Sequence, residues 1–291
     1  MSETILVTGA TGRTGGLVVK KLVERHRKVR ALVHKEDERS KALHSLGVEV
    51  VAGDMGLLSD VRRAMQGAST FYFVYPLDPG IVGASVVFAQ AAKEAGLELV
   101  VNMSQLPARP TAESPASLNH WLGEEAMNWS GVPVAHIRAT FFMDWFLWVA
   151  PFIQQAGKVI MPWFGDSKVT IVSTEDLARA IAQILIEPQS HVGKTLKLVG
   201  SQALSWEYMA QILSQELGKP IGYQQMDADA FAEPIGLGAY FRDHIRETTK
   251  TLAKGFFEVP NNLIEEITGS PPLTIAEFFR NNRSAFIAQT K

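Results

Sequence analysis

The segment that most constrains the fold is an apolar run at the start of the chain that leads directly into closely spaced glycines. Residues 5–16 have the sequence ILVTGATGRTGG, with glycines at positions 9, 12 and 15, and an amphipathic stretch follows over residues 14–24. A strand, a glycine turn and a helix in this order are typical of a phosphate-binding turn. Glycine lets main-chain N–H groups approach an anion closely, and the helix presents its positive N-terminal end to that anion. The alternative is an ordinary strand-to-helix turn, for which one glycine would be enough.

Strand and helix patterns then alternate through the first half of the chain. The predicted strands cover residues 29–33, 48–52, 70–74, 97–101 and 134–137, and the predicted helices cover residues 40–46, 57–65, 82–95 and 118–129. This alternation predicts an α/β fold, a Rossmann-type doubly wound parallel sheet with right-handed crossovers. In such a sheet ligands bind beyond the carboxyl ends of the strands, so the residues that follow each strand are candidates for a site.

The alternation is lost from about residue 141 onward. Short strands are expected at residues 159–161, 169–172, 195–198 and 221–225, between helices at residues 175–186, 206–217, 228–240 and 274–288. We therefore expect two domains. Residues 1–140 would form an NAD(P)-binding Rossmann domain, and residues 141–291 a smaller, mostly helical C-terminal substrate domain that is intertwined with the first.

Composition excludes several classes of function. The chain contains no cysteine, which excludes disulfides, thiolate catalysis and cysteine-ligated metals and suits a reducing cytoplasm, and we expect no metal site. The 28 Lys and Arg against 30 Asp and Glu give a formal charge of −2 without a basic stripe, so nucleic acid is not expected as a direct partner. The start of the chain lacks a targeting pattern, and the apolar run over residues 139–150 is short and interrupted by Asp144. We expect a soluble cytoplasmic protein that does not enter a membrane.

The residues after the second predicted strand indicate which nucleotide would bind. A classical NAD site has an acidic residue there, to accept hydrogen bonds from the ribose hydroxyls, whereas this chain has His34 and Lys35. A basic pair favours a 2′-phosphate, so we expect NADP(H) rather than NAD(H), with Arg13 within reach of the same phosphate. The alternative is that Lys35 and Arg13 are solvated surface charges.

Two further turns contribute to the predicted cofactor site. Asp54 and Met55 follow the third strand, and Asp54 would either accept a hydrogen bond from the adenine amino group or cap the helix that begins near Leu57. Tyr75 and Pro76 follow the fourth strand and would line the wall between ribose and nicotinamide, although Pro76 could simply end the strand. The predicted cofactor-binding residues are Gly9, Thr11, Gly12, Arg13, Thr14, Gly15, His34, Lys35, Asp54, Met55, Tyr75 and Pro76.

Four segments together resemble the NmrA-like group of atypical short-chain dehydrogenase/reductase proteins. They are TGATGRTGG at residues 8–16, GVEVVAGDM at residues 47–55, the stretch at residues 119–145 and ITGSPPLTIAEFF at residues 267–279. The resemblance extends over nearly the whole chain and implies an NADP(H)-binding Rossmann domain with a small C-terminal domain. It also implies two competing functions, since some members reduce quinones, dyes or related aromatic compounds and others are non-catalytic cofactor sensors that bind regulatory proteins.

The chain departs from the wider superfamily at the catalytic positions. Typical members carry a Tyr-x-x-x-Lys pair, in which the lysine lowers the pKa of the tyrosine, but none of the 5 tyrosines here has a lysine four residues later. In related isoflavone-reductase-like enzymes a lysine lies eleven residues before the glycine of a Gly-Ile/Val-Pro turn, and here that position holds His120, before Gly131. His120 could donate a proton, or it could be a structural histidine on a helix. Ser104 matches a serine that helps to hold a substrate carbonyl in the superfamily.

Residues 104–164 contain the candidates for a substrate pocket. Ser104 and the adjacent Gln105 are either polar anchors or loop residues that bond to their own backbone. Aromatic residues are dense between positions 121 and 164. Their helical spacing favours packing, whereas their place after the sixth strand favours a pocket for a planar substrate, and both interpretations remain open. The predicted pocket residues are Gln105, Trp121, Phe142, Trp145 and Trp163.

Three functions follow from these observations. The first is an NADPH-dependent reductase of a small aromatic or conjugated acceptor such as a quinone, whose reduced anion needs no strongly organised acid. The second is a non-catalytic NADP(H)-binding redox sensor of NmrA type with a regulatory protein partner. The third, a sugar-nucleotide epimerase, requires the absent tyrosine. A homodimer is also compatible with the sequence.

Overall fold

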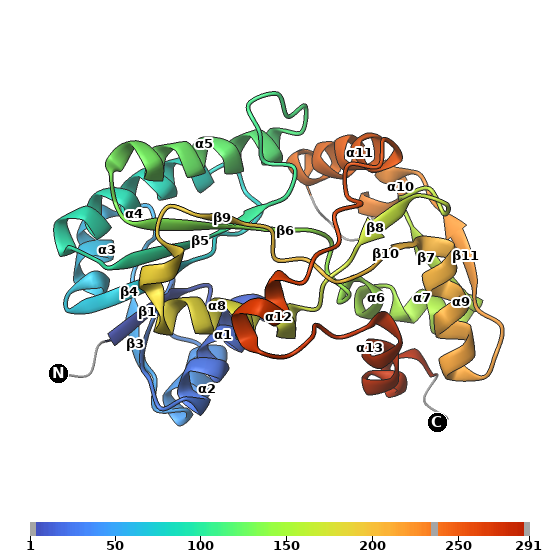
Figure 1. Cartoon of the computed structure of the whole chain (residues 1–291), viewed down its shortest axis with the longest axis horizontal. Helices are drawn as coiled ribbons and strands as arrows, with labels where there is room; N and C mark the ends of the chain where they lie inside the picture. The colour runs from blue at the N-terminus through green and yellow to red at the C-terminus, as the bar shows by residue number, and fades with distance from the viewer. Residues whose placement is uncertain (1–3, 234–237, 288–291) are drawn as a thin grey trace. The chain divides into compact units, whose positions relative to one another are not determined.

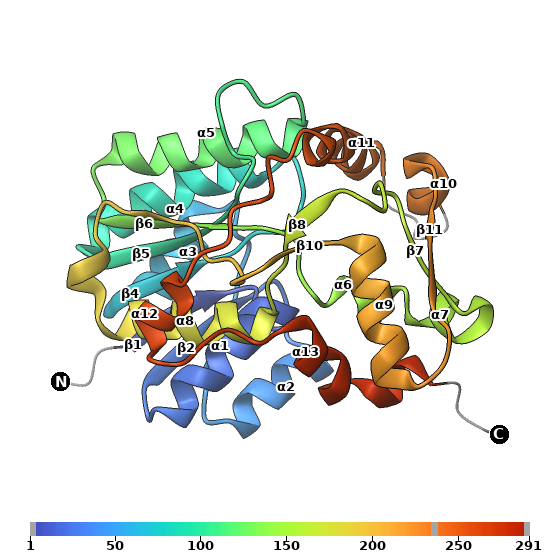
Figure 2. The same ribbon diagram turned by 45° about the vertical axis from the view of Figure 1, so that its right-hand side comes forward.

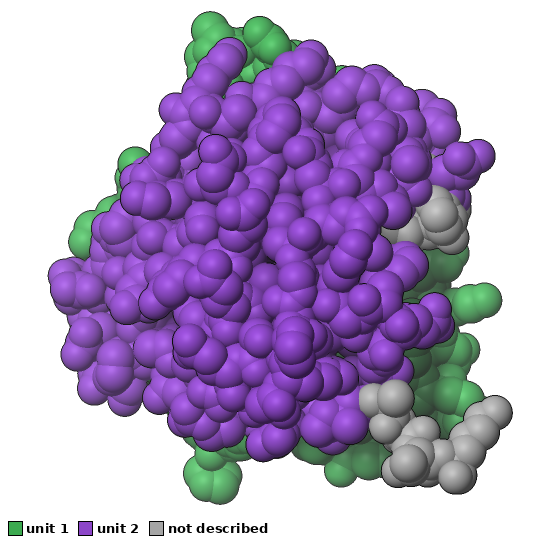
Figure 3. Space-filling model, turned by 90° about the vertical axis from the view of Figure 1, so that its right-hand side faces the viewer, with its two compact units in different colours: residues 1–139, 177–197 green, residues 140–176, 198–291 purple. Residues whose placement is uncertain are grey.

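The computed structural model describes residues 4–233 and 238–287. The chain divides into two compact units, which Figure 3 shows in different colours. The first unit comprises residues 1–139 and 177–197, and the second comprises residues 140–176 and 198–291. The chain therefore leaves the first unit after residue 139 and returns to it for a helix and a short strand.

The first unit contains a seven-stranded sheet in which every neighbouring pair of strands is parallel. Its strands, in spatial order, are β3 (Glu49–Ala52), β2 (Lys28–Val33), β1 (Thr4–Thr8), β4 (Ala68–Phe73), β5 (Leu99–Gln105), β6 (Val134–Ala139) and β9 (Thr195–Leu196). The order reverses between β1 and β4, which is the switch point at which ligands bind in doubly wound sheets. The predicted fold class is confirmed.

Helices cover both faces of this sheet, as Figures 1 and 2 show. They are α1 (Arg13–Glu24), α2 (Glu38–Ser45), α3 (Leu58–Met65), α4 (Ile81–Ala95), α5 (Pro115–Ser130) and α8 (Thr174–Ile186), followed by the 3₁₀ helix η1 (Pro188–His191). The strands are apolar because both of their faces are buried. On the face covered by α3, α4 and α5, the Phe71 and Phe88 rings stack with centroids 5.0 Å apart, within a core that includes Phe73 and Val100.

The second unit is built from short elements. Its strands are β7 (Lys158–Met161), β8 (Lys168–Thr170), β10 (Ala203–Ser205) and β11 (Gly222–Gln225), which form two pairs, β8 with β10 antiparallel and β7 with β11 parallel. Its helices are α6 (Trp145–Trp148), α7 (Ala150–Ala156), α9 (Trp206–Leu217), α10 (Ala228–Ala232), α11 (Ala239–Ala253), α12 (Leu263–Thr268), α13 (Ile275–Asn281) and the 3₁₀ helix η3 (Arg283–Phe286).

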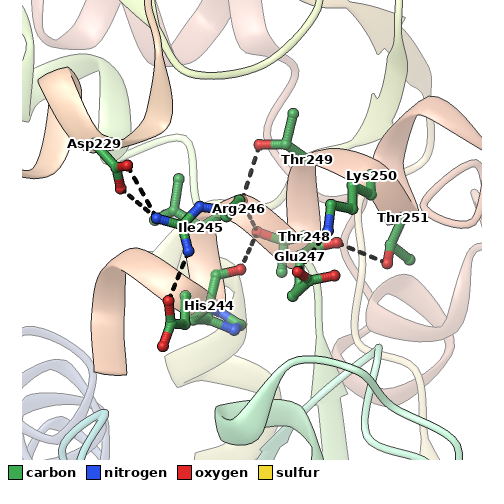
Figure 4. A network of polar contacts seen from close by, with 10 residues as sticks. Asp229, His244, Ile245, Arg246, Glu247, Thr248, Thr249, Lys250 and Thr251 are labelled. Atoms are coloured by element: carbon green, nitrogen blue, oxygen red, sulfur yellow. Dashed lines mark hydrogen bonds and ion pairs between the residues drawn. The ribbon is translucent and has the colours of Figure 1, made fainter. Parts of the chain in front are cut away.

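The predicted helix over residues 228–240 is wrong. Helix α10 ends at Ala232 and a new helix, α11, begins at Ala239, while residues 234–237 lie outside the described part. The sequence of α11 is polar, and ion pairs stabilise its outer side. Arg246 binds Asp229 of α10 at 2.7 Å and Asp243 of its own helix at 2.8 Å (Figure 4). Such a helix has few apolar residues, which is why the sequence did not predict its extent.

Among the remaining boundaries, two show the largest differences from the prediction. The last predicted helix ends at Asn281 and gives way to η3, and its predicted final residue, Ala288, lies outside the described part. Strand β5 continues past Val101 to Gln105, because its polar residues pair along β6. Within residues 4–233 and 238–287, no helix is long and apolar enough to cross a bilayer.

Candidate functional site

The turn after β1 has no room for a side chain at two of its glycines, Gly9 and Gly15. Gly9 has a φ of +59°, and Gly12 N–H donates to the Gly9 carbonyl over 2.8 Å. A Cβ on Gly9 would lie 2.6 Å from Val74 Cγ1, and a Cβ on Gly15 would lie 2.3 Å from the Gly9 carbonyl oxygen. Both positions therefore require glycine, which supports the interpretation as a specialised turn over an ordinary one.

This turn delivers the N-terminus of α1 to the switch point. Gly12 is the N-cap, no side chain caps the helix, and its first turn contains no acidic residue. The first N–H groups of a helix have no partner within the helix and carry a partial positive charge. Thr8 ties the turn to the next strand, since its Oγ1 donates to the Val74 carbonyl over 3.0 Å and accepts from the Val74 N–H over 2.9 Å. These features fit the pyrophosphate of a dinucleotide.

The structure places the basic residues on the surface of the first unit. Arg13 begins α1, and His34 and Lys35 follow β2, and all three are exposed. The acidic residue Asp37, which follows them, interacts with the start of α2. Asp37 caps α2, accepting from the backbone N–H groups of Arg39 and Ser40 over 2.9 and 3.2 Å. Positive charge is therefore accessible at the end of β2.

Asp54 does not cap a helix, so that alternative is wrong. Helix α3 has Leu57 as its N-cap without a side-chain hydrogen bond, and Asp54 Oδ1 instead accepts from the Gly56 N–H over 2.7 Å. The Asp54 N–H donates to Asp60 Oδ2 over 3.0 Å, which holds this loop against α3. The carboxylate of Asp54 is exposed, so a role toward adenine stays a prediction.

Tyr75, Pro76 and Met55 also lie beyond strand ends. Strand β4 ends at Phe73, so Pro76 is outside the sheet and does not interrupt its ladder. Tyr75 is half-buried against Phe73, and burial raises the pKa of Tyr75, with a further contribution from the carboxylates of Asp78 and Asp54. The phenol is thus a neutral donor at physiological pH.

Ser104 and Gln105 are the last residues of β5 rather than loop residues. Ser104 is 4% exposed and lies beside Arg138 of β6, and its Oγ has no hydrogen-bond partner among the described residues. The alternative in which both residues bond to their own backbone is therefore wrong. Gln105 Oε1 instead accepts from Ser117 Oγ of α5 over 3.4 Å. His120 and Trp121 lie in α5 and are half-buried, and their roles stay predictions.

A buried ion pair beneath α5 was not predicted. Glu124, with a side chain 2% exposed, accepts from Arg138 Nε over 3.0 Å and from Arg138 Nη2 over 2.5 Å. The pair joins α5 to β6 one helical turn after His120, and Arg138 compensates the charge of Glu124. Glu124 is therefore engaged as a structural partner, and breaking such a buried pair is costly.

A second polar link lies further along the same helix. His136 Nδ1 is 3.0 Å from Asn102 Nδ2, and His136 Nε2 is 3.0 Å from Asn128 Oδ1. Burial lowers the pKa of His136, which favours its neutral form. A pattern in the sequence could have revealed these two links. Two apolar strands carry polar residues at alternate positions, Asn102 and Ser104 in β5 and His136 and Arg138 in β6, and alternate residues face the same side of a sheet.

The aromatic residues of the second unit form a packed core. Trp163 has no exposed surface and stacks on Trp206 with ring centroids 4.5 Å apart, while Phe141 meets it edge-on at 4.7 Å. Packing therefore accounts for Trp163. Trp145 is half-buried and contacts Trp163 at 5.4 Å and the exposed Trp148 at 4.9 Å.

The helical spacing inferred for this segment begins later than expected. Helix α6 starts at Trp145, and Phe142 instead forms an isolated parallel bridge with Val172. Trp163 has no exposed surface and therefore does not line a pocket, which corrects the prediction for this residue. Whether Trp121, Phe142 and Trp145 contact a substrate stays a prediction. No group of three His, Asp or Glu side chains that could hold a metal ion occurs in the described part of the chain.

The parallel sheet, its strand order and the glycine turn at the switch point define a Rossmann-type α/β protein. Within that class, the model of the NmrA-like family matches residues 1–280. The chain belongs to the NmrA-like family, as its four sequence segments predict.

Proteins similar to this chain include enzymes and, in fold, a regulator. An NAD(P)H azoreductase of Xenophilus azovorans is 29% identical over 287 residues, which are 97% of this chain and 99% of the relative. The crystal structure of an NADPH-dependent quinone oxidoreductase from Escherichia coli, complexed with NADPH, has a TM-score of 0.85 at 24% identity and covers 96% of this chain and 99% of its own. That of the Citrobacter triphenylmethane reductase, complexed with NADP(H), has a TM-score of 0.83 at 25% identity and covers 95% and 99%. NmrA, a negative transcriptional regulator in complex with NAD, has a TM-score of 0.80 at 16% identity and covers 96% and 95%.

Proposed function

We propose that this protein is an NADPH-dependent oxidoreductase that transfers a hydride to a small aromatic or conjugated acceptor such as a quinone. The observation that carries the proposal is the turn at residues 9–15, where Gly9 and Gly15 have no room for a Cβ and an uncapped helix N-terminus begins. The azoreductase, 29% identical over nearly its full length, and the triphenylmethane reductase support the class of acceptor.

The residues at the ends of the first three strands would hold the cofactor. Backbone N–H groups of residues 11 and 13–15 would bind the pyrophosphate, and Gly9, Gly12 and Gly15 would keep the turn tight enough to present these groups to it. Arg13, His34 and Lys35 are exposed and would bind a 2′-phosphate, which favours NADP(H) over NAD(H). Asp54 and Met55 would lie beside the adenine, and Tyr75 and Pro76 would line the wall between the ribose and the nicotinamide.

Reduction of a quinone requires little acid catalysis from the protein. When bound, the reduced nicotinamide supplies a hydride, so that NADPH, a proton and a quinone become NADP⁺ and a hydroquinone. The chain has no Tyr-x-x-x-Lys pair, and His120 and Ser104 are the candidate polar groups for orienting the acceptor or supplying the proton. The aromatic residues Trp121, Phe142 and Trp145 would provide apolar surface for a planar acceptor, whereas Trp163 is buried in the core.

The proposal also assigns roles to the two parts of the chain and a place of action to the protein. Residues 1–140 would bind the cofactor and residues 141–291 would contribute substrate-binding surface. The protein would act in the cytoplasm, either alone or as a homodimer.

The second candidate function is a cofactor sensor that binds a regulatory protein. Two observations favour it, namely the missing Tyr-x-x-x-Lys pair and the similarity in fold to NmrA. A sensor would bind NADPH without oxidising it.

One experiment separates the two. The protein is incubated with NADPH and a panel of quinones, azo dyes and cationic triphenylmethane dyes while the absorbance of the reduced nicotinamide is followed. We expect oxidation well above the protein-free rate, and His120→Ala with normal NADPH affinity but slower turnover would place His120 in the mechanism. Tight NADPH binding with no oxidation across the panel would contradict the reductase and favour the sensor.

A further inference from the structure

We propose that Gln105 is a neutral hydrogen-bond donor for a carbonyl oxygen of the acceptor. It would favour quinones and other conjugated carbonyl compounds over acceptors that lack such an oxygen. The inference rests on the proposed reductase function and gives Gln105 a specific chemical role in determining specificity.

The backbone of Gln105 is held at the carboxyl edge of the sheet. Gln105 ends β5 opposite Ala139 of β6, and the next N–H, that of Leu106, donates to the Ala139 carbonyl over 2.8 Å. The Gln105 carbonyl accepts from the Ala108 N–H over 3.1 Å. The side chain therefore starts from a fixed point, at the edge where ligands bind in this fold.

The amide group of Gln105 is held at one end only. Ser117 Oγ of α5 donates to Gln105 Oε1 over 3.4 Å, and Ser117 is itself buried. Gln105 Nε2, at the other end, is buried without a hydrogen-bond partner among residues 4–233 and 238–287. Buried polar atoms are nearly always paired, because an unpaired buried donor costs free energy. An acceptor oxygen of a bound molecule would supply the missing partner.

The chemistry of an amide suits a carbonyl acceptor. An amide N–H does not titrate, so it donates over the whole physiological pH range. Its hydrogen bond strengthens as the quinone oxygen gains negative charge during hydride transfer, which stabilises the transition state more than the bound substrate. A cationic triphenylmethane dye takes the hydride at its central carbon and offers no carbonyl oxygen, so this donor would not affect its reduction.

The test compares two acceptors in one protein. For the full-length chain and the variants Gln105→Leu and Gln105→Glu, kcat/KM is measured with a benzoquinone and with a cationic triphenylmethane dye, alongside the Kd for NADPH. Gln105→Leu is expected to lower kcat/KM for the quinone by about tenfold, the effect of losing one hydrogen bond of about 1.4 kcal/mol. Gln105→Glu is expected to lower it further, since a carboxylate repels the developing anion. For Gln105→Leu, the dye kinetics and the NADPH affinity should stay unchanged. Equal losses for both acceptors, or no loss for the quinone, would overturn the proposal.

A second measurement does not depend on turnover. Binding of the quinone to the NADP⁺-loaded protein, which has no hydride to give, is followed by calorimetry, and Gln105→Leu should weaken it several-fold. An unchanged Kd, or no binding to the wild type, overturns the role of Gln105. If the wild type binds the quinone through Gln105 but oxidises no NADPH, the reductase proposal fails and the inference about Gln105 stands.

Ser117 acts in this arrangement as a positioning residue. Ser117→Ala removes the hydroxyl that holds Gln105 Oε1 but keeps the helix cap, because Ser114 Oγ accepts from the backbone N–H of residue 117 over 3.2 Å. We expect kcat/KM for the quinone to fall by less than it does in Gln105→Leu. We expect kcat/KM for the dye and the melting temperature to stay unchanged. Equal losses for both acceptors would indicate a purely structural role.

Discussion

The phosphate turn of the first unit and the aromatic core of the second unit are built in opposite ways. The turn excludes side chains at Gly9 and Gly15, since a Cβ on Gly15 would lie 2.3 Å from the Gly9 carbonyl oxygen and a Cβ on Gly9 would lie 2.6 Å from Val74 Cγ1. The core consists of side chains, with Trp163 stacked on Trp206 at 4.5 Å and neither ring exposed. Where the backbone itself is tightly packed, as at Gly9 and Gly15, only glycine fits. The volume of a hydrophobic core, in contrast, can be filled by many combinations of side chains. This difference explains why the turn could be recognised from the sequence and the packing of the aromatic residues could not.

The largest expected effect tests the core. Trp163→Ala should lower the free energy of unfolding by about 3–5 kcal/mol, because it leaves a cavity beside Trp206 and Phe141. Urea denaturation measures the change. The control is Trp129→Ala, the same substitution at a side chain that is 74% exposed, for which a change within about 0.5 kcal/mol is expected. Similar values for the two variants would mean that the cluster is not a packed core.

The next largest effect tests the turn. Gly15→Ala should weaken NADPH binding by on the order of 100-fold, because the added Cβ forces the turn apart, and calorimetric titration measures the loss. Gly83→Ala is the matched control. A Cβ on Gly83, within α4, meets nothing within 4 Å, so binding should be unchanged and stability slightly increased. Normal NADPH binding by Gly15→Ala would remove the turn from the cofactor site.

A third prediction concerns pH and a half-buried side chain in the second unit. Burial lowers the pKa of His244 in α11 from 6.5 to about 4. Between these two pH values the unfolded chain binds a proton that the folded chain does not. The free energy of unfolding is therefore highest above pH 6.5 and decreases as the pH drops toward 4. The expected loss between pH 7.5 and pH 5 is roughly 2 kcal/mol.

The wild type and His244→Gln are compared by urea denaturation at both pH values. The variant should lose less stability on acidification, because the residue at position 244 no longer titrates. An identical loss in both proteins would show that His244 is not the group responsible.

The smallest expected effect concerns the charge beside the turn. Lys35→Ala should weaken NADPH binding by about tenfold, or about 1.4 kcal/mol, and leave NADH binding unchanged, because only NADPH carries the 2′-phosphate. Lys41→Ala is the control, since Lys41 is an exposed lysine of α2 that pairs with Glu38 at 2.6 Å. Equal losses for both cofactors would contradict the assignment of Lys35.

Much of the first unit could be predicted because its signals are local. Apolar runs and intervening helices revealed the strands of the parallel sheet, and the residues after each strand pointed to the candidate cofactor site. Errors arose where polar residues were stabilised by distant partners. Strand β5 extends to Gln105 because Asn102 binds His136, 34 residues away. The carboxylate of Asp54 bonds Gly56 and not the start of α3, a choice that local spacing left open.

The sequence by itself determined the fold class, the family, the position of the glycine turn and the absence of a Tyr-x-x-x-Lys pair, because these depend on residue types at fixed short spacings. Only the tertiary structure decided that Trp163 belongs to a core, that Arg138 compensates Glu124 and that Ser117 holds one end of the Gln105 amide. Each of these depends on which side chains from separate elements meet, and that is set by packing across the fold. The donor left unpaired on Gln105 is a property of that packing, and no spacing in the chain could have revealed it.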